Sequence, residues 1–386
     1  MPGDETASPK PLLPAELTID AVFDAYFDCR RHKRNTLNQL AFEADLESNL
    51  VALWRDLAAG TYRIGRSLAF VVTYPKIREI WAADFRDRVV HHVIYNAIRD
   101  RFLRRFIRDS YACIPGRGNH DGLARVSAMA RSATQGWSRP ASYLKIDIAN
   151  FFSSIDRLIL LELVLARVPE PWLRQLVSQV ILHDPRPGAV YKSTPAQFAR
   201  VPVHKSLRRA APGIGLPIGN LTSQFFANIY LDTLDQFAKR TLNVRYYGRY
   251  VDDMVLLHED PGQLHAWCLA VDEFLQNTLH LRLHPKKIQL NRLDHGLNFI
   301  GFIVKPGRTY LRRSTLANCH KRVRGWVHAG RPVDPAALAG VTQSVNSYLG
   351  MLRAVDGYNE RRRICESFDT LFAHPDDAFT KIITAR

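Results

Sequence analysis

Three aspartates indicate the chemistry of this chain. Asp147 ends a strand-like run on the face opposite its apolar residues, and Asp252 and Asp253 lie at the tip of a predicted hairpin between residues 244–250 and 254–258. Carboxylates brought together repel one another, and divalent cations are the natural compensation. Two Mg²⁺ ions about 3.5–4 Å apart can activate an attacking oxygen and stabilise a leaving pyrophosphate, so the acids predict phosphoryl or nucleotidyl transfer. Taken singly, the alternatives are an ordinary hairpin turn for Asp252-Asp253 and a helix N-cap for Asp147.

The remaining sequence must supply the elements that hold these acids. Residues 142–148 alternate apolar and polar side chains, which is the period of a half-buried strand. Helical periodicity covers 19–58, 84–107, 156–182, 220–240 and 261–279, and further strand-like runs cover 68–74, 281–290 and 297–304. Residues 183–213 are loop-like, and the sequence assigns no role to them. Mixed strands and helices with an antiparallel hairpin predict an α+β fold.

Composition and charge narrow the class of protein. The 386 residues are 46% hydrophobic and 10% aromatic, which is enough for a real core and unlike a disordered chain. Lys plus Arg is 53 against 37 for Asp plus Glu, a formal charge of +16. That excess favours a polyanionic partner, nucleic acid before a membrane surface, with a basic surface kept only for solubility as the alternative.

The sequence lacks the features of disulfide-rich, Cys-rich zinc-binding, membrane and secreted proteins. Five widely spaced cysteines argue against a disulfide framework and against a Cys-rich zinc site. Apolar runs fall short of a membrane span, and the first residues lack a signal pattern. We therefore expect a soluble, cytoplasmic protein with no membrane partner.

Seven ordered segments carry a family resemblance. Three of them resemble the palm of reverse transcriptases: Asp147-x-x-x-Phe151-Phe152, Gly215-Leu216-Pro217-Ile218-Gly219-Asn220-Leu221-Thr222-Ser223-Gln224 and Tyr250-Val251-Asp252-Asp253. Four are similar to flanking blocks of that family: Pro75-Lys76-Ile77-Arg78-Glu79-Ile80 with Asp87-Arg88-Val89-Val90, Gly116-Arg117-Gly118, Leu281-x-Leu283-His284-Pro285-x-Lys287 and Phe299-Ile300-Gly301-Phe302. The resemblance spans about residues 68–305 and implies a right-hand polymerase with fingers, a palm with an antiparallel sheet, and a helical thumb.

The resemblance implies which residues perform the reaction. Asp147, Asp252 and Asp253 would bind two Mg²⁺ ions, with Mn²⁺ as an alternative, and the Ile148 carbonyl would contact the metal on the nucleotide side. Lys287 matches the family lysine proposed to protonate the leaving pyrophosphate. Because Lys286 is adjacent, either lysine could match that family position.

A second set of residues would bind the nucleotide: Lys76, Arg78, Ile148, Phe152, Ile218, Gln224 and Tyr250. Lys76 and Arg78 resemble the fingers residues that grip incoming phosphates, with a solvated strand end as the alternative. Phe152 stands where the family places its sugar gate. A flat aromatic ring there would clash with a ribose 2′-hydroxyl and favour deoxynucleotides. The alternative is a core Phe beside Phe151.

One position points to a branch of the family. Ile218-Gly219-x-x-x-Ser223-Gln224 is similar to the form found in diversity-generating retroelement enzymes, where most relatives carry Gln-Gly-x-x-x-Ser-Pro. An Ile side chain neither donates nor accepts a hydrogen bond. The resemblance therefore implies reduced fidelity, notably opposite template adenine, and the alternative is an apolar filler without a role in fidelity.

The grip on nucleic acid is predicted from Phe299 and Gly301 and from two basic segments. Phe299 and Gly301 resemble the primer grip, where glycine lets the backbone approach closely, although a strand with a bulge is the alternative. Residues 305–386 hold 14 Lys/Arg and 7 Asp/Glu, and residues 76–131 hold 12 and 6, which suits binding of a hybrid by its backbone.

These assignments predict a domain order along the chain. Residues 1–19 would be a flexible tail, 20–305 the fingers and palm, and 306–386 a basic helical thumb, with a generic basic bundle as the alternative for the last.

The implied function is an RNA-directed DNA polymerase, bacterial or phage-encoded, that extends a DNA or RNA primer on an RNA template with dNTPs. The favoured role is error-prone synthesis from the template repeat of a diversity-generating retroelement, where the family typically works with a small basic pentameric accessory protein. A bacterial defence-associated or retron-type reverse transcriptase is the first alternative, and a catalytically silent RNA-binding protein is the second. Fewer than 90 residues follow Gly301-Phe302, which argues against added maturase, endonuclease or RNase H domains.

Overall fold

The computed structural model describes residues 17–31, 36–74, 76–328, 335–367, 372–373 and 376–384. Most of the predicted tail and Pro75 of the first flanking block lie outside these ranges. The chain divides into two compact units. Unit 1 holds Met1–Ile107, Ile148–Phe237 and Glu273–Arg282, and unit 2 holds Arg108–Asp147, Ala238–Asp272 and Leu283–Arg386.

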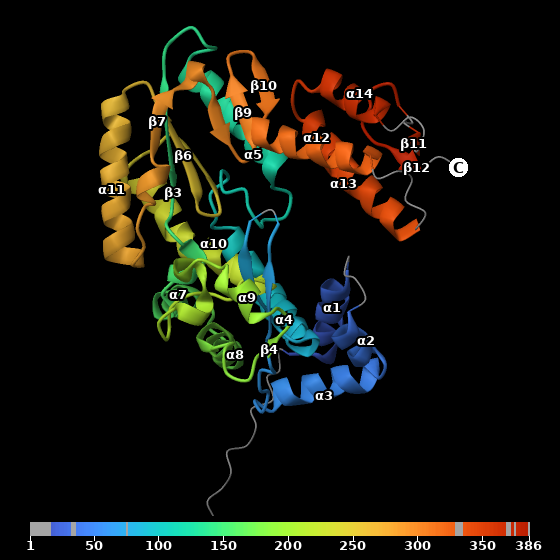
Figure 1. Cartoon of the computed structure of the whole chain (residues 1–386). Helices are drawn as coiled ribbons and strands as arrows, with labels where there is room; N and C mark the ends of the chain where they lie inside the picture. The colour runs from blue at the N-terminus through green and yellow to red at the C-terminus, as the bar shows by residue number, and fades with distance from the viewer. Residues whose placement is uncertain are drawn as a thin grey trace, which may run out of the picture. The chain divides into compact units, whose positions relative to one another are not determined.

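Unit 1 is mainly helical. Its helices include α1 (Ile19–Arg30), α2 (Leu37–Glu43), α3 (Leu46–Ala58), α4 (Phe85–Leu103), α6 (Phe151–Ser154), α7 (Arg157–Leu165), α8 (Pro171–Leu182) and α10 (Leu221–Gln236). Helices α1 and α2 both contact α4, and Figure 1 shows α1–α3 gathered at the blue end of the chain. Phe225 of α10 meets the rings of Tyr95, Phe102 and Phe106 edge-on at 5.0, 5.9 and 6.1 Å, which fixes α10 against α4 and the residues just after it.

A small sheet in unit 1 carries the predicted phosphate-gripping residues. Strand β1 (Leu68–Val72) pairs antiparallel with β2 (Arg78–Ala82) and parallel with β4 (Val190–Tyr191). The prediction of a loop over 183–213 was therefore wrong in part, because this segment holds β4, α9 (Pro195–Ala199) and two 3₁₀ turns, Val203–Lys205 and Leu207–Arg209. Elements this short show no periodicity. Phe198 and Leu207 instead anchor them on Ala69 and Trp81.

Unit 2 contains the predicted antiparallel sheet, in the order β5-β6-β3-β7. The strands are β5 (Tyr246–Tyr250), β6 (Asp253–His258), β3 (Ser142–Asp147) and β7 (Gln289–Arg292), and β3 pairs with β6 on one side and β7 on the other. The mixture of sheets and helices is compatible with the α+β prediction. The predicted strand over 281–290 was wrong except at its last two residues, because β7 begins at Gln289 and residues 285–287 form the 3₁₀ turn η4 (Pro285–Lys287).

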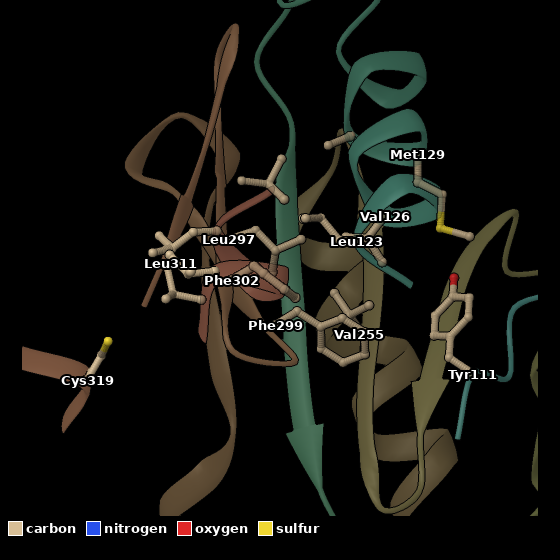
Figure 2. Close-up of a cluster of buried hydrophobic side chains, with 14 of the residues drawn as sticks. Tyr111, Leu123, Val126, Met129, Val255, Leu297, Phe299, Phe302, Leu311 and Cys319 are labelled. Atoms are coloured by element: carbon tan, nitrogen blue, oxygen red, sulfur yellow. The ribbon is translucent and has the colours of Figure 1, made fainter. Parts of the chain in front are cut away.

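A second sheet of unit 2 packs on helix α5 (Asn119–Ala133). It consists of β8 (Leu297–Phe299), β9 (Phe302–Lys305) and β10 (Arg308–Leu311). The predicted continuous strand over 297–304 is interrupted at Ile300 and Gly301, whose φ values of 45° and 90° make a tight two-residue hairpin. Figure 2 shows Leu123, Val126 and Met129 of α5 in the same buried cluster as Val255, Phe299 and Phe302.

The C-terminal part of unit 2 is mainly helical. They are α12 (Arg313–His328), α13 (Pro335–Arg353) and α14 (Tyr358–Glu366), drawn orange to red in Figure 1. His320 Nε2 lies 3.1 Å from Glu360 Oε2, which joins α12 to α14. Helix α11 (Pro261–Leu279) is as predicted and contributes to both units. Among the described residues, no helix is long and apolar enough to cross a membrane.

Candidate active site

The three predicted acids meet at one end of the unit 2 sheet. Asp147, the last residue of β3, lies directly opposite Asp253, the first residue of β6, and Asp253 is flanked on its other side by Tyr250 of β5. Asp252 occupies the turn between β5 and β6. Helix α6 begins after Asn150, so Asp147 is not its N-cap. The acids therefore form one cluster at the strand ends, which we call the acidic site.

Two lysines neutralise part of this charge. Lys287 Nζ lies 2.6 Å from Asp147 Oδ1, and Lys145 Nζ lies 3.4 Å from Asp253 Oδ2. The backbone N–H of His284 donates to the Asp147 carbonyl at 2.8 Å, which fixes η4 on the end of β3. Lys145 was not among the predicted site residues, although its place two residues before Asp147 puts both on one face of the strand.

Burial and the uncompensated negative charge raise the pKa values of two of the acids. Burial, followed by repulsion from Asp147 and Asp253, raises the pKa of Asp252 to about 6, against a smaller opposing effect of Lys287. Burial and the Asp147 charge also raise the pKa of Asp253, while Lys145 and Lys287 oppose the shift. The acidic site thus holds more negative charge than its two lysines compensate.

This donor set suits a divalent cation. Carboxylate oxygens are hard ligands of the kind Mg²⁺ takes, and a cation would relieve the repulsion that raises the pKa of Asp252. Among the described residues, no group of three or more His, Cys, Asp and Glu side chains is arranged so that it could hold a metal ion. The Lys287 and Lys145 ammonium groups contact the carboxylates instead.

Unit 1 brings the predicted nucleotide-binding segments together. Within it, the Leu216 N–H donates to the Phe152 carbonyl at 2.7 Å, and the Trp81 N–H donates to the Ile218 carbonyl at 2.8 Å. Because Trp81 belongs to β2, the strand that Arg78 begins, the segment from Leu216 to Ile218 joins the predicted sugar-gate residue Phe152 to the strand of the predicted phosphate-binding residue Arg78. Gly219 has a φ of 132°, and a Cβ there would lie 2.9 Å from Ile80 Cγ2, so only glycine fits this close approach.

The other predicted residues of unit 1 are placed as follows. Phe151 is buried while Phe152, with ring centroids 5.3 Å apart, is partly exposed. Lys76 and Arg78 are exposed, and neither forms an ion pair with a described residue. Gln224 is exposed on α10. The side chain of Ile148, the residue after Asp147, is buried, so only its backbone could reach a ligand.

In unit 2, the predicted primer-grip residues and Tyr250 differ in exposure. Phe299 is 2% exposed and belongs to the core, whereas Gly301 lies in the partly exposed turn after it. A contact with nucleic acid at this point would therefore use the turn rather than the Phe299 ring. Tyr250 is partly buried, and burial raises its pKa.

Comparison with known proteins decides the family. The family model described as "Reverse transcriptase (RNA-dependent DNA polymerase)" matches residues 74–304, more than half of the chain. The chain belongs to the reverse transcriptase family. This reverse transcriptase is accordingly an RNA-directed DNA polymerase, a nucleotidyltransferase that uses an RNA template, a primer and dNTPs. No curated protein matches the chain.

Proposed function

We propose that the acidic site of this reverse transcriptase performs two-metal nucleotidyl transfer. Asp147, Asp252 and Asp253, with the Ile148 carbonyl, would hold two Mg²⁺ ions, or Mn²⁺ in their place. When bound, such ions neutralise the triphosphate and make the primer 3′-hydroxyl a better nucleophile. The observation that supports this is the meeting of the three carboxylates at the β3–β6 strand ends, where the pKa of Asp252 is raised.

The protein's own side chains would complete the reaction. The Lys287 ammonium group, next to Asp147, would give a proton to the leaving pyrophosphate. The exposed Lys76 and Arg78 would bind the incoming phosphates. The partly exposed ring of Phe152 would exclude a ribose 2′-hydroxyl, and Gln224 and Tyr250 would line the nucleotide site.

Primer extension tests this assignment. The wild type should extend a DNA primer on an RNA template with dNTPs, in the presence of Mg²⁺ and not of EDTA. The Asp252→Ala/Asp253→Ala variant should show no extension, whereas Asp260→Ala, which removes an exposed acid just beyond β6, should keep it. Extension by the double variant would refute the proposed role of the acidic site.

For the biological role we propose error-prone cDNA synthesis from the template repeat of a diversity-generating retroelement. The support is Ile218, whose apolar side chain offers no hydrogen bond to a template base. Ile218→Gln should lower misincorporation opposite template adenine, and Ile218→Leu should not. Equal adenine error rates in the wild type and Ile218→Gln would contradict this.

The neighbourhood of the gene separates this role from a defence-associated or retron-type enzyme. Paired variable and template repeats beside the gene would favour the diversity-generating role, in which a small basic pentameric protein would be the partner. We further propose that residues 20–305 form the fingers and palm and residues 306–386 a thumb that binds the hybrid backbone.

A further inference from the structure

Arg249, the residue before Tyr250 on β5, is a fully buried charged residue. Its exposed fraction is 0%, which makes it one of the largest completely buried side chains of the described chain. A guanidinium group carries five N–H donors and a permanent charge, so its burial is costly unless those donors are used. A position of this kind requires a structural or functional reason.

The Arg249 side chain reaches the tip of the catalytic hairpin. One guanidinium nitrogen, Nη1, donates to the Val251 carbonyl at 3.1 Å. Val251 immediately precedes Asp252, and its φ of 55° lies in the left-handed region. That conformation is strained for a β-branched residue and persists only where the surroundings impose it. The Arg249 hydrogen bond is one such constraint.

Arg249 is itself held by a neighbouring segment. Its N–H donates to the Asp109 carbonyl at 2.8 Å, and its carbonyl accepts from the Tyr111 N–H at 3.0 Å, so residues 109–111 run parallel to the outer edge of β5. The Asp109 carboxylate in turn accepts from Arg125 Nε of α5 at 2.7 Å and from the Tyr111 hydroxyl at 3.1 Å. A chain of fixed contacts thus runs from α5 to the turn that carries Asp252.

We propose that Arg249 is a positioning residue that holds the Val251–Asp252 turn in the conformation needed to bind metal. It would do so by fixing the Val251 carbonyl and thereby the direction of the Asp252 carboxylate. This proposal rests on the proposed metal-binding role of Asp252 and Asp253. Arg249 would support that role by holding the Val251–Asp252 turn, without itself contacting metal or substrate.

The test compares Arg249→Met and Arg249→Lys with Arg245→Met, which removes an exposed arginine four residues earlier. For each full-length variant we would measure the urea unfolding midpoint, Mn²⁺ binding by electron paramagnetic resonance, and single-turnover primer extension on an RNA template. A charge-assisted hydrogen bond of this type corresponds to about a tenfold to hundredfold change in an equilibrium. We expect Arg249→Met to weaken Mn²⁺ binding and slow extension by that factor, with the dNTP dissociation constant within about threefold of the wild-type value.

Two further variants keep the inference falsifiable. Glycine adopts positive φ without steric cost, so Val251→Gly in the Arg249→Met background should recover part of the lost Mn²⁺ affinity. If Arg249→Met does not fold, Arg249→Lys decides: slower extension at wild-type stability supports the proposal, and wild-type Mn²⁺ affinity and rate overturn it. Unchanged Mn²⁺ affinity in a folded Arg249→Met would also overturn it. Retention of Mn²⁺ binding by Asp252→Ala/Asp253→Ala would instead count against the proposed function.

Discussion

Lys287 Nζ and Asp147 Oδ1 lie 2.6 Å apart although 140 residues separate them in sequence. The turn η4 makes this contact, because it is hydrogen-bonded through His284 to the end of β3. Lys286, the neighbour that left the register open in the sequence, instead has its backbone N–H on His284 Nδ1 at 3.2 Å and its side chain exposed. The geometry thus favours Lys287 as the lysine that acts at the acidic site.

Replacing Lys287 with Met should slow single-turnover primer extension by about 10²–10⁴-fold, the usual contribution of a general acid. The matched variant Lys286→Met should stay within about twofold of the wild-type rate, since its side chain has no contact with the acids. Burst kinetics with a rapid quench would give both rates. Equal losses in the two variants would mean that Lys287 acts only through net charge.

The raised pKa of Asp252 predicts how stability depends on pH. Because the folded protein holds this proton more tightly than the unfolded chain does, the buried charge costs stability as the pH rises from about 4 through about 6. Asp252→Asn removes that cost. In metal-free buffer the variant should be more stable than the wild type by roughly 1–3 kcal/mol at pH 7.5.

Urea unfolding at several pH values would measure this difference, which should vanish near pH 4. Millimolar Mg²⁺ should raise the unfolding midpoint of the wild type more than that of Asp252→Asn, because a bound cation relieves the repulsion. If Asp252→Asn is no more stable than the wild type at pH 7.5, the charge of the Asp252 carboxylate does not destabilise the folded protein.

Phe151 and Phe152 should respond differently to truncation. Phe152→Ala should lower the preference for dNTPs over rNTPs by about tenfold to hundredfold, because loss of a steric block of this kind removes roughly 1.4–3 kcal/mol of discrimination. Phe151→Ala should leave the preference intact and destabilise unit 1 by about 3–5 kcal/mol, as expected for a buried Phe. Steady-state competition between dNTP and rNTP, with thermal unfolding of both variants, would separate the two roles.

Glu79 should hold residues 183–213 on the sheet of unit 1. This residue is 3% exposed and accepts from Trp81 Nε1 at 2.6 Å, Ser206 Oγ at 2.5 Å and Arg208 N at 3.2 Å. Glu79→Ala would leave these buried donors without their acceptor, at a cost of about 2–4 kcal/mol.

Limited proteolysis would test this prediction by the rate of cleavage within residues 183–213. Cleavage should accelerate in Glu79→Ala and stay unchanged in Glu162→Ala, which truncates an exposed acid on α7. Wild-type cleavage of Glu79→Ala would mean that apolar anchors alone hold the segment.

The main features of the palm were predictable because they depend on local patterns. Alternation over residues 142–148 gave β3 and the face of Asp147, and the two apolar runs around Asp252 and Asp253 gave the hairpin. Helix α11 begins and ends where its periodicity does. Each of these features depends on neighbours in sequence, which a single chain displays directly.

The features that escaped prediction depend on contacts between distant segments. In the sequence, Lys145 and Arg249 look like ordinary basic residues on strands. In the structure, Lys145 contacts the Asp253 carboxylate, and Arg249 donates a hydrogen bond to the Val251 carbonyl. The elements of 183–213 are held by Glu79 and Trp81, more than a hundred residues upstream. No periodicity in sequence records such pairings.

The position of β3 in the sequence also determines when the β5-β6-β3-β7 sheet can assemble. Both of its partners are synthesised much later: Asp147 pairs with Asp253, and Ser142 pairs with Arg292. During translation β3 therefore has no strand partner at either edge until about a hundred further residues have been synthesised. Non-local pairing of this kind folds slowly and exposes surface that aggregates. Nascent chains arrested before residue 292 should consequently depend on chaperones, and this enzyme should be recovered in better yield when its translation is slowed by lower temperature.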